Sequence, residues 1–155
     1  MPPKRPSRKQ ARRDALFVLY QREVTPLAVA ALLANILLSE GYRADEFTVR
    51  AVEGVIARQD ELDGELQAHS CHWPLSRMAP LERNVLRLGL YEMETGETPP
   101  EVAIDEAVRL AKRYSTDEAG ALVNGILAGI LRERGDGPVA DAAGAAGAAG
   151  ERTTP

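Results

Sequence analysis

The pattern of hydrophobic and polar positions is clearest between residues 81 and 94, where it predicts an amphipathic helix. One half of the helical wheel holds Leu81, Val85, Leu86, Leu88, Gly89, Leu90 and Met93. The other half holds Arg83, Asn84, Arg87 and Glu94. This division is typical of a helix that packs one face against a core, and Gly96 is a typical residue to end it.

Two more helices are predicted directly after this one, each with a capping signal at its start. Thr98 is a typical N-cap, Pro99 suits the first helical position, and Glu101 completes a capping box. The helix that follows carries Ile104, Ala107, Val108 and Ala111 at helical spacing. Residues 115–118 form a second predicted capping box, and the stripe after it comprises Leu122, Val123, Ile126, Leu127, Ile130 and Leu131.

The N-terminal half of the chain shows the same kind of signal. Ser7, the pair Thr25-Pro26 and Asp45 are each placed to begin a helix. The predicted segments are 7–23, 27–40, 45–68 and a short helix at 75–78. We expect Trp73 to anchor two helical sub-bundles to each other. These caps and stripes predict an all-α fold of about seven helices without a sheet.

Composition indicates how many domains the chain forms and in which cellular compartment it is expected. The chain has 155 residues, of which 45% are hydrophobic, as expected for one globular domain. The predicted segments are a flexible basic arm (1–7), a helical domain (8–134) and a disordered Gly/Ala-rich tail (135–155). A single cysteine, Cys71, excludes an internal disulfide. Without a membrane-length apolar run or a secretory signal, we expect a soluble, cytoplasmic protein.

Charge is distributed unevenly along the chain. The formal net charge is −4, which alone disfavours nucleic-acid binding. Residues 1–13, however, hold six basic residues and no acidic one: Lys4, Arg5, Arg8, Lys9, Arg12 and Arg13. A basic segment on an acidic body is typical of a nucleic-acid-binding arm. A solvated, charged helix start is the alternative that the composition leaves open.

No combination of residues indicates catalysis. His69, Cys71 and His72 are possible metal ligands, but no second Cys/His pair completes a tetrahedral site. We expect Cys71 to be a buried thiol rather than a nucleophile. The glycines do not form a phosphate-binding loop. The sequence therefore predicts a protein that is not an enzyme, with no catalytic residue, metal or cofactor.

Several runs, in order along residues 8–132, match a known family pattern. They are Ala11-Arg12, Ala15-Leu16, Leu19-Tyr20, Trp73 with Leu75 and Arg77, Glu82-Arg83, 86–88, 90–92, 102–107, 110–112 and 123–125. With these runs the chain resembles the NusB family of bacterial transcription antitermination factors. The resemblance implies two packed helical sub-bundles. It also implies binding to boxA RNA of nascent ribosomal RNA transcripts together with NusE, a small-subunit ribosomal protein, and entry into the RNA polymerase elongation complex.

The resemblance also assigns roles to residues. Those matching the family's RNA contacts are Arg8, Lys9, Arg12 and Arg13, with His69 and Arg77 as further candidates. Those matching its partner contacts are Tyr20, Val24 and Glu82. His69 stands where the family often has a tyrosine, and its ring retains the ability to stack on a base. Gln10 interrupts the basic run and leaves its register open. The sequence also leaves open whether the protein is a monomer or a homodimer.

Two alternative functions remain open at this point. NusB-like domains also occur at the front of RNA cytosine methyltransferases, which continue into a catalytic domain. Because this chain ends at Pro155, we expect it not to be such an enzyme. The other alternative is a helical module that homodimerises and binds only protein, which the basic segment at 1–13 disfavours.

Overall fold

The computed structural model describes residues 4–135, and within them the chain is helical without a strand. The elements are α1 (Arg8–Val24), α2 (Val29–Glu40), α3 (Glu46–Ala57), α4 (Gln59–Ala68), the 3-10 turn η1 (Leu75–Arg77), α5 (Pro80–Thr95), α6 (Pro100–Tyr114) and α7 (Asp117–Glu133). The predicted all-α fold is confirmed. Residues 1–3 of the predicted arm and residues 136–155 of the predicted tail lie outside the described part.

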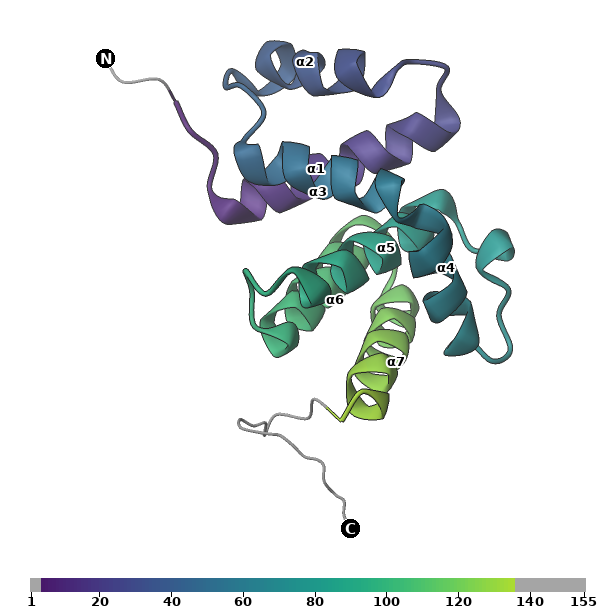
Figure 1. Cartoon of the computed structure of the whole chain (residues 1–155). Helices are drawn as coiled ribbons and strands as arrows, with labels where there is room; N and C mark the ends of the chain where they lie inside the picture. The colour runs from purple at the N-terminus through teal and green to yellow at the C-terminus, as the bar shows by residue number, and fades with distance from the viewer. Residues whose placement is uncertain (1–3, 136–155) are drawn as a thin grey trace.

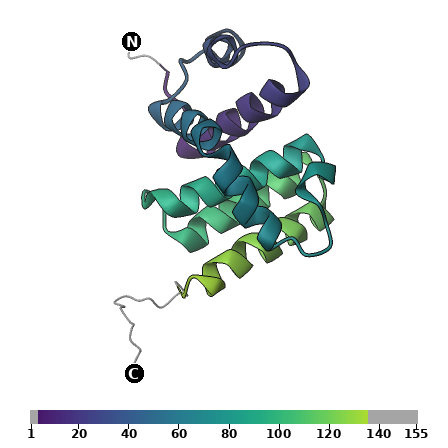
Figure 2. The same ribbon diagram turned by 45° about the vertical axis from the view of Figure 1, so that its right-hand side comes forward.

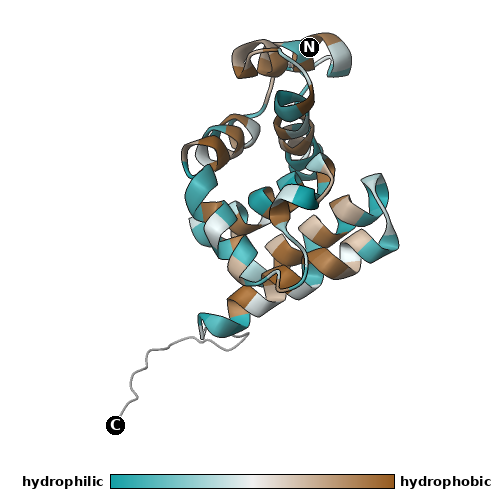
Figure 3. Cartoon of the chain, turned by 90° about the vertical axis from the view of Figure 1, so that its right-hand side faces the viewer, coloured by the Kyte–Doolittle hydropathy of each residue, from teal (hydrophilic) through white to brown (hydrophobic). Residues whose placement is uncertain are grey.

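Helix α5 is the centre of the fold. It packs against α1 and α3 on one side and against α4, α6 and α7 on the other. Figures 1 and 2 show the result: α1–α3 form an upper sub-bundle, α5–α7 a lower one, and α4 lies across α5 and α7. In Figure 3 hydrophobic residues are concentrated where the lower helices face one another. The helix predicted most clearly from the sequence is therefore the one that both sub-bundles share.

This central position corrects the predicted polar face of α5. Asn84 and Arg87, expected on the solvent side, are 0% and 5% exposed, and Glu92 is 2% exposed. The hydrophobic stripe, including Leu86 and Leu90, is buried as expected. Since neighbouring helices cover α5 on both sides, its polar side chains are enclosed and form ion pairs and hydrogen bonds inside the protein.

The predicted caps of α1 and α3 are confirmed. Ser7 Oγ accepts a hydrogen bond from the backbone N–H of Gln10 (3.1 Å), and Gln10 Oε1 accepts one from the N–H of Ser7 (2.8 Å). Gln10, which interrupts the basic run, thus completes a capping box. Asp45 caps α3 through the N–H of Phe47 (2.9 Å). Gly96 ends α5 at φ 80°, a left-handed conformation that favours glycine.

Three other predicted starts are wrong. Thr25 ends α1, because its N–H donates to the carbonyl of Gln21 (2.9 Å), and α2 begins only at Val29. The hydroxyl of Thr98 donates to the buried carboxylate of Glu92 (2.8 Å), so it is not free to cap α6. For α7, Thr116 rather than Ser115 is the cap. In each case the hydroxyl has a hydrogen-bonding partner that competes with the predicted cap.

The single helix predicted over 45–68 is divided at Arg58, whose backbone leaves helical geometry at φ −113° and ψ 18°. Helix α3 packs against α1 and α5, whereas α4 packs against α5 and α7. A straight helix does not reach both surfaces, so packing rather than a local sequence signal places the break.

The connector between α4 and α5 also differs from expectation. Trp73 is 50% exposed, so it is not an anchor between the sub-bundles, and Cys71 is exposed rather than buried. Leu75 and Met78 are the buried residues instead. The predicted short helix is present as η1. The N–H of Leu75 donates to Oε1 of Gln67 (2.7 Å), which holds the connector so that η1 supplies the hydrophobic contact that was expected of Trp73.

We predict that Gly89→Ala destabilises the fold. A Cβ on Gly89 would lie 2.8 Å from Leu127 Cδ1 and 3.0 Å from Ala107 Cβ, so α5 could no longer approach α6 and α7 as closely. The overpacking cost of about 2 kcal/mol should exceed the helix-propensity gain of about 1 kcal/mol. Urea unfolding followed by circular dichroism measures the difference. In the control, Gly64→Ala, the new methyl meets nothing within 4 Å, and an equal loss of stability there would contradict the packing argument.

Candidate nucleic-acid and partner interface

The exposed cations at the start of α1 are Arg8 and Lys9. The Arg8 guanidinium lies 4.3 Å from the centroid of the Phe47 ring, within cation–π distance, and 3.8 Å from a carboxylate oxygen of Glu97. Lys9 Nζ lies 3.8 Å from Glu106. Their side chains are 50% and 66% exposed, so both remain able to contact a phosphate.

Arg12, the third predicted RNA contact, lies inside the protein. It is 5% exposed, and its Nε and Nη2 donate to the two carboxylate oxygens of Glu92 at 2.9 and 2.5 Å. Glu106 lies 3.6 Å from its Nη1. A buried, two-pronged ion pair of this kind fixes geometry, so Arg12 joins the start of α1 to the last turn of α5.

Arg13, the fourth, ties α1 to the end of α2. Its Nη2 lies 3.0 Å from Asp14 Oδ1, 3.1 Å from Glu40 Oε1 and 3.1 Å from the Tyr42 hydroxyl. Burial, with the hydrogen bond to Asp14, raises the pKa of Tyr42 to about 12. Its phenol is therefore protonated at neutral pH and donates to Asp14 Oδ2 at 2.7 Å.

His69 and Arg77 belong to a different part of the surface. The end of α4 and η1 lie at the right in Figure 1, whereas the start of α1 lies at the left. His69 Nδ1 lies 3.2 Å from the carbonyl oxygen of Glu65, and Nε2 lies 2.8 Å from a carboxylate oxygen of Glu133 without hydrogen-bonding alignment. Arg77 is exposed. The six predicted RNA residues therefore form two separate groups.

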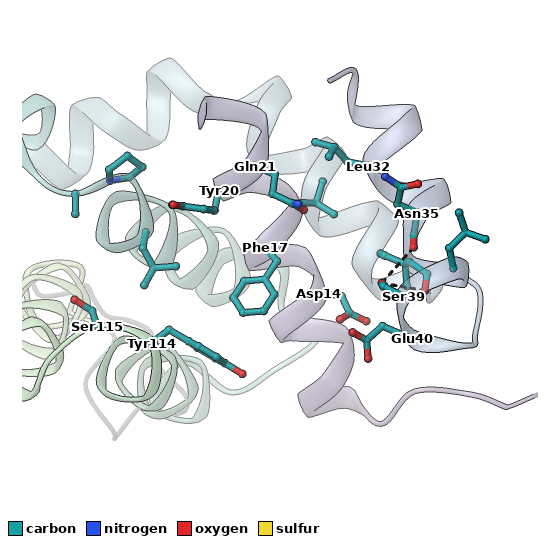
Figure 4. Close-up of a pocket in the computed structure, with 16 residues that line it drawn as sticks. Asp14, Phe17, Tyr20, Gln21, Leu32, Asn35, Ser39, Glu40, Tyr114 and Ser115 are labelled. Atoms are coloured by element: carbon teal, nitrogen blue, oxygen red, sulfur yellow. Dashed lines mark hydrogen bonds between the residues drawn. The ribbon is translucent and has the colours of Figure 1, made fainter. Parts of the chain in front are cut away.

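A groove of about 920 Å³ runs between α1, α2 and the junctions before α5 and after α6. Tyr20 is half-buried and lines it, and Phe17 and Tyr114 meet edge-to-face within it, with centroids 4.9 Å apart. Figure 4 shows Tyr20 and Phe17 along one side of α1, with Tyr114 facing Phe17 from α6. Val24, one turn beyond Tyr20, is 47% exposed. The predicted aromatic contact thus lies in a concave, partly apolar surface.

Glu82 lies beside the same groove. Its Oε2 accepts a hydrogen bond from the hydroxyl of Ser115 (2.8 Å), and Ser115 lines the groove together with Tyr20. The structure therefore brings Tyr20 and the hydrogen-bond partner of Glu82 to one surface. Phe17 and Tyr114, which line it as well, were not singled out from the sequence because aromatic residues in amphipathic helices look like core residues.

A charged network at the other end of α1 was also missed. The Glu23 carboxylate accepts hydrogen bonds from Arg83 Nη2 (2.6 Å), Asn84 Nδ2 (2.7 Å) and Arg87 Nη1 (2.8 Å). Arg87 also donates to both oxygens of Asp63 on α4. The network joins α1, α4 and α5 next to the exposed Val24, so α1 is held at both of its ends.

Among residues 4–135, no three His, Cys, Asp or Glu side chains are grouped so as to hold a metal ion. None of the helices formed by these residues has the length and apolar character needed to cross a membrane.

Comparison with known proteins identifies the family. The NusB family model matches residues 9–132. The chain belongs to the NusB family. It is 40% identical to the transcription antitermination protein NusB of Rubrobacter xylanophilus, with 84% of this chain and 97% of that protein covered.

Solved NusB structures share the fold. The T. maritima NusB structure superposes with a TM-score of 0.75 at 34% identity, covering 84% of this chain and 94% of that one. A crystal structure of the antitermination factors NusB and NusE in complex with dsRNA superposes with a TM-score of 0.72 at 27% identity. The match covers 81% of this chain and 96% of that one. The two-sub-bundle arrangement described above is thus the NusB arrangement.

The Glu23 network makes a prediction about pH. Burial by itself raises the pKa of Glu23, but hydrogen bonds from Arg83 and Asn84 and the nearby charge of Arg87 outweigh it and lower the pKa below its ordinary 4.5. Because the pKa of Glu23 is lower in the folded state, the ionised carboxylate stabilises the fold fully above about pH 4.5. This stabilisation is lost as the pH falls through the lowered folded-state pKa.

We therefore expect Glu23→Gln to lower the unfolding free energy by about 2 kcal/mol at pH 7 and by progressively less in acid. Urea unfolding of wild type and variant between pH 7 and pH 3 measures this. Glu46→Gln is the control, because that side chain is 95% exposed and has only a surface ion pair with Arg50, so it should change stability by about 0.5 kcal/mol or less at every pH. A difference for Glu23→Gln that stays constant down to pH 3 would contradict the assignment.

Proposed function

We propose that this protein is an RNA-binding transcription antitermination factor that acts together with NusE and by binding rather than by catalysis. The observation that carries the proposal is the organisation of α1. Its start presents Arg8 and Lys9 to solvent, and three turns later Tyr20 lines the concave surface beside Ser115 and Glu82. A NusB relative of similar structure is found with both a protein partner and dsRNA, which supports two binding surfaces.

The RNA surface is centred on the start of α1. Exposed cations beside a capped helix start can neutralise phosphates, which supplies most of the affinity of such contacts. Arg12 and Arg13 contribute mainly by holding α1 in place, since both are engaged with carboxylates of the protein. We assign boxA RNA of ribosomal RNA transcripts as the target and the cytoplasmic RNA polymerase elongation complex as the setting.

The partner surface is the groove at Tyr20. It combines aromatic side chains with the carboxylate of Glu40, whose side chain is 37% exposed, and Glu82 adds a second acid nearby. Asp14 also lines the groove, but it is buried and bound by Arg13 and Tyr42. An apolar floor with an acidic rim suits a protein partner that carries basic residues around a hydrophobic contact. NusE, as a ribosomal protein, is the partner that we assign to it, with Val24 extending the contact beyond the groove.

The first test concerns the partner. We expect Tyr20→Asp to abolish NusE binding in calorimetric titration while leaving the helical circular dichroism signal and the unfolding midpoint close to wild type. The substitution places an unpaired charge in a surface that becomes desolvated on binding. Val102→Asp is the control, because Val102 is 45% exposed on α6 and does not line the groove. Wild-type NusE affinity in Tyr20→Asp, or unfolding of that variant, would refute the assignment.

The second test concerns RNA. Deleting residues 1–13 would also remove the buried Arg12, so we choose Arg8→Gln/Lys9→Gln instead. Each phosphate contact to a single strand adds about 0.7 to the log–log salt slope of binding, so the double variant should bind boxA RNA more weakly with a slope smaller by about 1.4. Fluorescence anisotropy over a salt series measures both quantities. Arg22→Gln/Arg132→Gln removes the same charge elsewhere, and equal behaviour of the two variants would show that Arg8 and Lys9 are not the contact.

A further inference from the structure

A second groove, of about 750 Å³, lies between the start of α1 and the end of α6. Its lining includes six cations, Lys9, Arg12, Arg13, Arg109, Lys112 and Arg113, and a single carboxylate, Glu106. Half of these cations come from α6, a helix without a binding role predicted from the sequence. This concentration of positive charge stands out because the chain as a whole carries a net charge of −4.

The two helices present their cations with the same spacing. On α1 they are residues 9, 12 and 13, and on α6 they are residues 109, 112 and 113. Positions i, i+3 and i+4 lie on one face of a helix, so each helix turns a three-cation face toward the groove. The groove is therefore bordered by two matching rows of positive charge.

The two rows differ in whether their cations are paired with carboxylates of the protein. Each cation of the α1 row has a carboxylate within 4 Å: Glu106 for Lys9, Glu92 for Arg12, Asp14 for Arg13. In the part of the chain that the structure describes, Arg109, Lys112 and Arg113 have none at that distance, and all three are exposed. Like charges at i and i+4 repel each other, so the α6 row is a surface that an external anion would stabilise.

A favourable interaction with the helix dipole explains only some of the cations in the α6 row. Lys112 and Arg113 lie in the last turn of α6, where positive charge interacts favourably with the helix dipole. Arg109 lies a turn earlier, where that effect has faded. Two side chains of the α6 row are held in place by neighbouring residues. Arg113 Nε donates to the Tyr114 hydroxyl at 3.2 Å. The aliphatic part of Lys112 packs against Gly120, where an added Cβ would lie 2.6 Å from Lys112 Cγ.

We propose that this groove binds the phosphodiester backbone of RNA, with Arg109, Lys112 and Arg113 as phosphate ligands facing Lys9. The inference rests on the proposed RNA-binding function and extends that surface from α1 onto α6. Tyr114 supports the arrangement, because it lines both this groove and the partner groove at Tyr20. RNA in one groove and a protein in the other would be neighbours across a single side chain.

The test is Arg109→Gln/Arg113→Gln, which removes two charges from the α6 row and leaves all of α1 intact. Each single-strand phosphate contact contributes about 0.7 to the log–log salt slope of binding. Loss of two contacts should therefore reduce this slope by about 1.4 and weaken binding about 25-fold at 0.1 M salt. Anisotropy with boxA RNA and with poly(U) measures this. Arg22→Gln/Arg132→Gln is matched in charge and residue type, lies outside the groove, and should bind like wild type, with circular dichroism verifying the fold of every variant.

The outcomes separate this inference from the proposed function. If wild type binds RNA and the α6 variant binds as the control does, the α6 row is not an RNA surface and the inference is wrong, although the function stands. If the α6 variant keeps its RNA affinity but loses NusE, the groove serves a protein, which also overturns the inference. If wild type binds neither boxA RNA nor poly(U), the proposed function itself fails. A loss confined to the α6 variant, on both RNAs, supports a backbone contact.

Discussion

The arrangement of this molecule depends on the buried ion pair between Arg12 and Glu92. Two charges withdrawn from water contribute little net stability against a well-packed hydrophobic pair, but loss of either one leaves an uncompensated charge, at a cost of about 3–5 kcal/mol. The pair joins α1 of one sub-bundle to α5 of the other, and Thr98 donates to the same carboxylate. It therefore fixes where the start of α1 lies, and with it the positions of Arg8 and Lys9.

The opposite end of α1 is fixed by Glu23 and its three donors on α5. A helix held at both ends presents its outward-facing residues at a constant separation and orientation. This rigidity matters because α1 carries a basic surface at its start and an aromatic one near its end, and two ligands can be bound side by side only if their surfaces keep a fixed relation. Polar contacts in the interior thus determine the geometry of the exterior.

The sequence predicted what local physics decides and failed where distant parts of the chain compete. The stripes of α5 and α7, the end at Gly96 and the caps at Ser7 and Asp45 depend on neighbours within a few residues, and they are confirmed. Thr98 failed as a cap because the buried Glu92 takes its hydroxyl. The break at Arg58 and the exposure of Trp73 result from how α4 and the connector pack, for which no local pattern exists.

The candidate site shows the same limit. The basic character of α1 was evident, but Arg12 finds its partner 80 residues further along the chain, and a count of charges cannot distinguish an internal cation from an external one. The α6 row was detectable in principle, since its spacing repeats that of residues 9, 12 and 13. Its significance arises only when the fold places residues 109–113 beside α1 and leaves their charges unneutralised.

The distribution of these charges suggests how RNA would be confined to one part of the surface. An acidic body repels a polyanion, and a concave surface lined by cations attracts it and concentrates the field. The partner groove, with Glu40 and Glu82 at its edge, lies beside the cationic groove, and Tyr114 lines both. RNA and a basic protein would each be drawn to the surface of opposite charge. Because the two surfaces adjoin, the negative backbone and the basic partner would also attract each other across Tyr114, so the binding of either one would favour the other without any change in the fold.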